Sequence, residues 1–102
     1  MKRSVRYIMT EKVFLYPGES AVWHFVQITK KFGLEIKEKF GKNRRGFGSI
    51  PVEVTLGKTV WQTSIFPDKY SGSYILPLKA AVRKTEGIQE GEKIKFSIEI
   101  KI

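Results

Sequence analysis

The stretch SYILPLKAAVRKTEGIQEGEKIKFSIEIKI, residues 73–102, decides the fold. It begins with a short run of strand-forming residues. Pro77 follows, and proline is favoured at the first position of a helix, so we expect a helix over residues 78–87 that ends at Gly87. Residues 93–102 then alternate between polar and apolar side chains, which is typical of an antiparallel strand with one buried face. The stretch therefore predicts a strand, a helix and a second strand.

A similar order of elements precedes this stretch. Residues 21–28 form a predicted strand that is apolar enough to be buried on both faces. Residues 30–40 form a predicted helix with apolar side chains at helical spacing, flanked by an N-cap at Thr29 and a C-terminal end at Gly41. Strands follow over the ranges 47–56 and 59–66. Each half thus contains strands and one short helix, which indicates an internal pseudo-repeat.

The remaining segments complete a mainly β fold with two short helices. Residues 4–16 are rich in β-branched and aromatic types and predict one strand or two short ones. Residues 66–73, FPDKYSGS, contain many turn formers and are predicted to form a loop. The length of 102 residues is that of one domain, so we expect a single domain over residues 1–102.

The composition excludes several kinds of site. The sequence has no cysteine, one histidine and one aspartate, so we expect neither a disulfide nor a metal site, and no cofactor is assigned. Charged residues interrupt the N-terminal segment, and no apolar run approaches the length of a membrane span. We therefore expect a cytoplasmic protein without a membrane partner.

Catalytic motifs are missing as well. A triad of Ser64, His24 and Asp68 is formally possible, but no nucleophile-elbow motif accompanies it. The glycines near residues 41–48 do not have the spacing of a phosphate-binding loop, and no carboxylate pair stands out. We expect a protein that is not an enzyme, and we assign no catalytic residue.

The segment RRGFGSIPV, residues 44–52, resembles the beginning of an RNA-recognition signature. That signature places stacking aromatics two positions apart, but here Phe47 is followed at that spacing by Ser49. Pro51 also removes a hydrogen-bond donor from the strand. We therefore interpret the segment as a basic loop that leads into a bent strand.

The formal net charge of +9 attracts phosphates and other anions. A basic surface that is only solvated is the alternative interpretation. The candidates for nucleic-acid or phosphate binding are Lys42, Arg44, Arg45, Phe47, Lys69, Lys79 and Arg83.

A second hypothesis is a pocket for a small ligand or anion, which would serve a partner enzyme. Aromatic side chains beside lysines could stack a base or hold an anion. The alternative is a tryptophan in the core and a loop held by Asp68. A protein-interaction domain, monomeric or homodimeric, is a third possibility. The candidate pocket residues are Trp61, Ser64, Asp68 and Tyr74.

Three motifs resemble a known bacterial family. They are W-x-T-S-x-F-P-D-K from Trp61, Y-x-L-P-x-K-A-A-V-R from Tyr74, and G-I-x-x-G-[DE] from Gly87. With the upstream YPGESAVWHFVQI, they resemble the DUF1905 family, a domain of unknown function. Its members occur alone or fused to bacteriocin-protection domains. The resemblance implies a pseudo-symmetric double-split β-barrel with two short helices, and it supplies no function.

Residues 74–100 are also similar, at the level of the fold, to the swapped-hairpin unit of AbrB/MazE-type transition-state regulators. Those proteins are dimers that bind DNA through basic residues. A fold likeness does not fix a function. Together with the positive charge, it makes nucleic acid the favoured ligand of a non-catalytic binding module.

Overall fold

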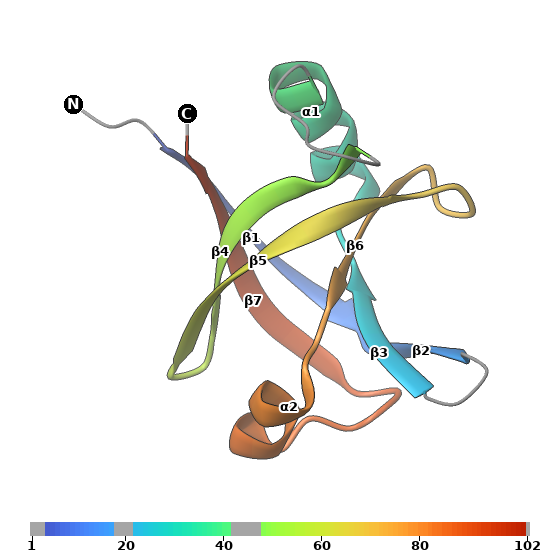
Figure 1. Cartoon of the computed structure of the whole chain (residues 1–102), viewed down its shortest axis with the longest axis vertical. Helices are drawn as coiled ribbons and strands as arrows, with labels where there is room; N and C mark the ends of the chain where they lie inside the picture. Colours follow the sequence, from blue (N-terminus) through green and yellow to red (C-terminus); the bar gives the residue numbers. More distant parts are fainter. Residues whose placement is uncertain (1–3, 18–21, 42–47, 102) are drawn as a thin grey trace.

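The computed structural model describes residues 4–17, 22–41 and 48–101 (Figure 1). Seven strands and two short helices make up this part of the protein, so the predicted mainly β fold is confirmed. The strands are β1 (Ser4–Lys12), β2 (Phe14–Pro17), β3 (Val22–Gln27), β4 (Ile50–Leu56), β5 (Thr59–Asp68), β6 (Ser73–Pro77) and β7 (Lys93–Lys101). The helices are α1 (Lys30–Phe40) and α2 (Ala80–Glu86).

The strands form one antiparallel sheet in the order β1-β7-β4-β5-β6-β3-β2, which curls into a half-barrel (Figure 1). The strands at the two ends of this order, β1 and β2, are consecutive in the sequence and are separated only by Val13. The segment before Val13 pairs with β7, and the segment after it pairs with β3. Strand β5 likewise pairs with two different neighbours along its length: its first part pairs with β4, and residues 66–68 pair with β6. The pairing thus repeats between the two halves of the sequence.

The apolar side chains of β4 and β7 point into the core from alternate positions along each strand. The predicted inward positions of both strands are buried: Ile50, Val52, Val54, Leu56, Ile94, Phe96, Ile98 and Ile100. Ser97 is also buried, although the alternation predicts an outward position. The guanidinium of Arg6 on β1 donates to the Ser97 hydroxyl from Nε and Nη2, at 3.2 Å each. This hydrogen bonding allows a polar side chain to be buried there.

Helix α1 has the predicted bounds and the predicted buried face. Ile36 and Phe40 are buried, and the ring of Phe32 packs on Tyr7 of β1 with centroids 5.2 Å apart. The N-cap prediction for Thr29 is only partly right. Thr29 flanks the helix, but its hydroxyl makes no capping hydrogen bond and donates instead to the carboxylate of Glu11.

Helix α2 begins later than the sequence predicts. Pro77 is the last residue of β6, and the N–H of Leu78 donates to the carbonyl of His24 at 2.9 Å, so the backbone stays paired with β3. The helix starts at Ala80, and Val82 is its buried residue. The predicted end is confirmed, because Gly87 adopts the left-handed conformation with φ of 66°.

Two further predictions need correction. The range 66–73 is not all loop, because residues 66–68 continue β5. Strand β3 is not buried on both faces: Trp23 is 57 % exposed and Phe25 is half-buried. The helices lie at opposite ends of the sheet in Figure 1, and the outer face of β3 remains partly open to solvent.

Candidate functional site

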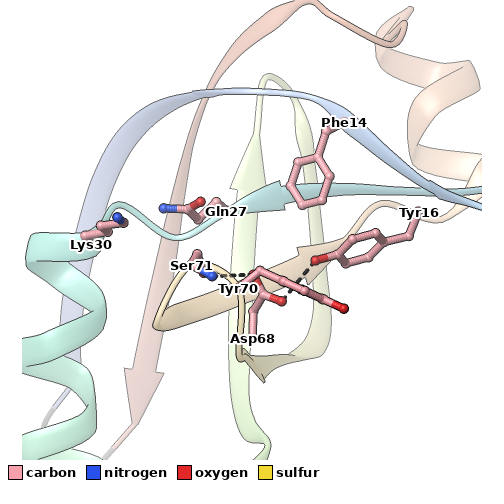
Figure 2. A pocket seen from close by; sticks show the side chains of 7 residues that line it. All are labelled: Phe14, Tyr16, Gln27, Lys30, Asp68, Tyr70 and Ser71. Carbon is pink, nitrogen blue, oxygen red and sulfur yellow. Dashed lines mark hydrogen bonds between the residues drawn. The ribbon is translucent and has the colours of Figure 1, made fainter.

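An open groove of about 630 Å³ lies between β2, the end of β3, the start of α1 and the loop after β5. Figure 2 shows Lys30 and Gln27 at one end, Phe14 and Tyr16 at the other, and the loop residues between them. Its volume is in the range of small-molecule sites, roughly 300–1,000 Å³. We call this the aromatic groove; it is lined by Phe14, Tyr16, Gln27, Lys30, Asp68, Tyr70 and Ser71.

The rings at one end of the groove form a packed cluster. Phe14 and Tyr16 are two residues apart on β2, so both project from the same face of the strand. Phe25 lies directly opposite Phe14 on β3. The centroid of Tyr16 lies 5.3 Å from that of Phe14 and 5.3 Å from that of Phe25, both in edge-on arrangements. Such packing holds the rings in place.

Tyr70 supplies a ring of a different kind. It lies in the turn between β5 and β6 and is 93 % exposed. An aromatic ring left in water costs hydrophobic free energy that burial would recover, so an exposed ring beside a groove is suited to ligand contact. The groove thus combines fixed rings on β2 with a free ring on the loop.

Asp68 anchors the loop. The hydroxyl of Tyr16 donates to its Oδ1 at 2.9 Å, and the N–H of Ser71 donates to its Oδ2 at 3.2 Å. Burial acts to raise the pKa of Asp68, but hydrogen bonds from Ser71, Tyr16 and the loop backbone outweigh it, so the pKa is lowered. Burial and the bond to Asp68 raise the pKa of Tyr16. At neutral pH the carboxylate is therefore ionised and the phenol is neutral.

A smaller pocket of about 150 Å³ lies between β3, β5 and the link from β6 to α2. Its Trp61 is buried, whereas its Trp23 is 57 % exposed. The Nδ1 atom of His24 is buried without a hydrogen-bond partner. Burial and, to a lesser degree, Arg83 lower the pKa of His24, and Glu90 acts in the opposite direction. We call this the tryptophan pocket; it is lined by Trp23, His24, Trp61, Gln62, Thr63, Pro77, Leu78 and Lys79.

The four residues proposed for a ligand pocket are distributed over the molecule. Trp61 lines the tryptophan pocket and Asp68 lines the aromatic groove. Tyr74 is buried in the core. Ser64 is half-buried on β5, opposite Pro51 of β4.

The basic candidates are also dispersed. Lys79 joins Trp61 in the tryptophan pocket. Lys69 is exposed in the turn after β5. Arg83 on α2 donates from Nε to the carbonyl of Leu78 at 3.1 Å. Four further candidates lie outside the described residues: Lys42, Arg44, Arg45 and Phe47.

The sequence interpretation missed Phe14, Tyr16, Tyr70 and His24 as pocket residues. A signal for the first two was present, because aromatic residues recur at alternate positions in FLY (14–16) and WHF (23–25). Two aromatics spaced by two residues on paired strands can share one outer face. Assigning β3 to a strand buried on both faces obscured this signal.

Within residues 4–17, 22–41 and 48–101, no three His, Cys, Asp or Glu side chains gather where they could hold a metal ion. Neither helix in the same ranges has the length and apolar character needed to cross a bilayer.

Comparison with known proteins identifies a family. No curated protein matches the sequence. The family model of DUF1905, described as a domain of unknown function, matches residues 11–98. The match spans the three motifs that begin at Trp61, Tyr74 and Gly87, so the resemblance drawn from them is confirmed. The protein therefore belongs to the DUF1905 family.

Proposed function

We propose that this protein is a non-catalytic cytoplasmic binding module that holds single-stranded nucleic acid in the aromatic groove. One observation carries the proposal: the rings of Phe14, Tyr16 and Tyr70 line an open groove that also contains the cation Lys30. Proteins that bind single strands combine a positive groove with aromatic side chains on which bases stack. The protein has the positive charge, +9, that such binding requires.

The ends of the groove suit the two parts of a nucleotide. Bases would stack at the aromatic end, on Tyr16 and the exposed Tyr70. Phosphates would lie toward Lys30, where neutralisation releases counterions and contributes to affinity. Lys31 follows Lys30 on α1, and Lys69 precedes Tyr70; both are exposed. These neighbours add positive potential beside the groove.

Asp68 keeps its negative charge, because the groups that donate hydrogen bonds to it, the Tyr16 hydroxyl and the Ser71 N–H, are neutral. A phosphate would therefore lie toward Lys30 and not beside this carboxylate. Removing these hydrogen bonds would release Tyr70 from its position. We therefore assign Asp68 a positioning role in the groove and no direct contact with phosphate.

A single strand fits the groove better than a duplex. The faces of paired bases are covered by their neighbours in the stack, whereas unpaired bases can be splayed out onto aromatic side chains. Lys79 and Arg83 do not line the groove and are not part of the proposed site. Lys42, Arg44 and Arg45 lie outside the described residues.

Tyr70→Ala is expected to weaken binding of a labelled single-stranded oligonucleotide about tenfold, because one stacked base is lost. The fold should persist, since the side chain is 93 % exposed. Fluorescence anisotropy measures the affinity and circular dichroism checks the fold. Leu34→Ala is the matched control, because Leu34 is an exposed apolar residue of α1, 61 % exposed, that does not line the groove. Equal losses in both variants would contradict the assignment of the groove.

Lys30→Gln tests the electrostatic part of the proposal, the contact between Lys30 and a phosphate. If Lys30 neutralises one phosphate, its loss should reduce the slope of log affinity against log salt by about 0.7 for a single strand. Lys95→Gln removes the same charge from an exposed position on β7 and serves as the control. An unchanged slope in Lys30→Gln, or an equal change in both variants, would remove Lys30 from the phosphate path.

A further inference from the structure

We propose that the tryptophan pocket is a second binding site, which takes a small carboxylic acid with a planar or branched apolar body. None of its lining residues lines the aromatic groove. The site therefore goes beyond the nucleic-acid proposal, and either proposal can be contradicted without affecting the other.

The walls of the pocket are suited to an apolar body. The buried ring of Trp61, the ring of Pro77 and the side chain of Leu78 contribute apolar surface, and Trp23 adds a second indole. The volume of about 150 Å³ corresponds to roughly five water molecules at about 30 Å³ each. This is space for a ring or a short branched alkyl group and is too small for a nucleoside. Pockets of this composition bind through apolar contact and use a few polar groups for orientation.

A polar group without a partner lies inside this apolar setting. Nδ1 of His24 is buried and has no hydrogen-bond partner in the protein. The backbone at His24 cannot easily shift to supply a partner for Nδ1, because the His24 carbonyl already accepts a hydrogen bond from the N–H of Leu78. Leaving a buried side-chain nitrogen unpaired is costly, so a ligand whose polar group reached it would gain a hydrogen bond that the protein does not supply. Thr63 is a further polar residue of the lining, whereas the amide of Gln62 already donates to the carboxylate of Glu53 at 2.6 Å.

The charges around the pocket select an anion. Lys79 lines the pocket and is exposed, so its ammonium group can reach a ligand at the mouth. Arg83, four residues further along the sequence, adds positive potential at His24, and Glu90 opposes it. A carboxylate would therefore be held at Lys79, with its apolar body against the indoles. The apolar walls disfavour a bare inorganic anion, which has no body to bury.

The single histidine of the protein makes this testable by NMR, because its ring protons give one set of signals. The probe is benzoate, with benzamide as a neutral ligand of the same shape and acetate as an acid without the ring. We expect benzoate to shift the His24 signals saturably, with a dissociation constant on the order of 1 mM. Bound benzoate should also raise the pKa of His24, because a nearby negative charge favours the protonated imidazole. Benzamide and acetate should each bind at least about tenfold more weakly than benzoate.

Lys79→Gln should weaken benzoate binding about tenfold while the His24 signals of the free protein stay close to those of the wild type. Lys95→Gln is the control and should leave benzoate binding unchanged. Saturable binding of benzamide as tight as that of benzoate would overturn the assignment of an acid site. Absence of a shift with benzoate at tens of millimolar, or binding that Lys79→Gln leaves intact, would overturn the site as described.

Discussion

Ile98→Ala should lower the free energy of unfolding by about 2–5 kcal/mol, the usual cost of truncating a fully buried isoleucine. Ile98 is 0 % exposed and lies on β7 between two partners, Tyr7 of β1 and Val54 of β4. The surrounding strands are fixed by their ladders and cannot close the cavity. Because domains of this size are stable by about 5–15 kcal/mol, the loss is a large part of the total.

Chemical denaturation with circular dichroism measures this loss, and the melting temperature should fall by about 10 °C or more. Ile8→Ala is the matched control. Ile8 is also an isoleucine of the same sheet, on β1, but it is 57 % exposed. Its truncation should cost at most about 1 kcal/mol. Equal losses of unfolding free energy at the two positions would contradict the assignment of Ile98 to the core.

Gly33→Ala should destabilise the fold by about 1–3 kcal/mol, as overpacking does in a close contact. A Cβ at Gly33 would collide with the hydroxyl of Ser73 and lie 2.9 Å from its Cβ and 3.3 Å from its Cα. That hydroxyl donates to the carbonyl of Ile28 at 2.7 Å in the interior, so it cannot turn away without losing the bond. The preference of alanine over glycine in a helix, about 1 kcal/mol, offsets only part of this cost.

Gly41→Ala is the control for this prediction. Gly41 has the right-handed helical conformation, and a Cβ there would meet nothing within 4 Å. Its substitution should leave the unfolding free energy unchanged or slightly higher. Adding Ser73→Gly to Gly33→Ala should recover part of the loss. If Gly33→Ala is as stable as the wild type, α1 does not pack against β6 as closely as described.

The strands that the sequence predicted best are those with strict alternation. In β4 and β7 every second side chain is apolar, and burial follows the pattern everywhere but at Ser97, because one face is inside the half-barrel. Helix α1 was equally clear, since its apolar residues recur at helical spacing over three turns. These signals are local, so one sequence is enough to read them.

The errors arose where distant segments pair. Leu78 stays extended because it bonds to the carbonyl of His24, which overrides the preference of proline for the start of a helix. Residues 66–68 continue β5 because β6 pairs with them. Trp23 is 57 % exposed, and an apolar run alone does not reveal that. Such features depend on tertiary contacts and have no local signal.

The grouping of residues in the candidate sites also depends on tertiary contacts. The rings of Phe14 and Tyr16 meet the 68–71 loop only because Tyr16 reaches Asp68, 52 residues further along the sequence. Trp61 and Lys79 were selected for their chemistry and do lie together in the tryptophan pocket. Asp68 was selected with them but lies in the aromatic groove. Residue types could suggest the chemistry, whereas the grouping required the fold. The family was recognisable because its three motifs are long.

The central claim is that the aromatic groove binds single-stranded nucleic acid, and one titration tests it most directly. A labelled single-stranded oligonucleotide and the matching duplex are titrated with the protein at about 50 and about 200 mM salt and followed by fluorescence anisotropy. We predict saturable binding that is tighter for the single strand and weakens as salt increases. Absence of binding to the single strand at the lower salt concentration, or equal affinity for the duplex, would contradict the claim.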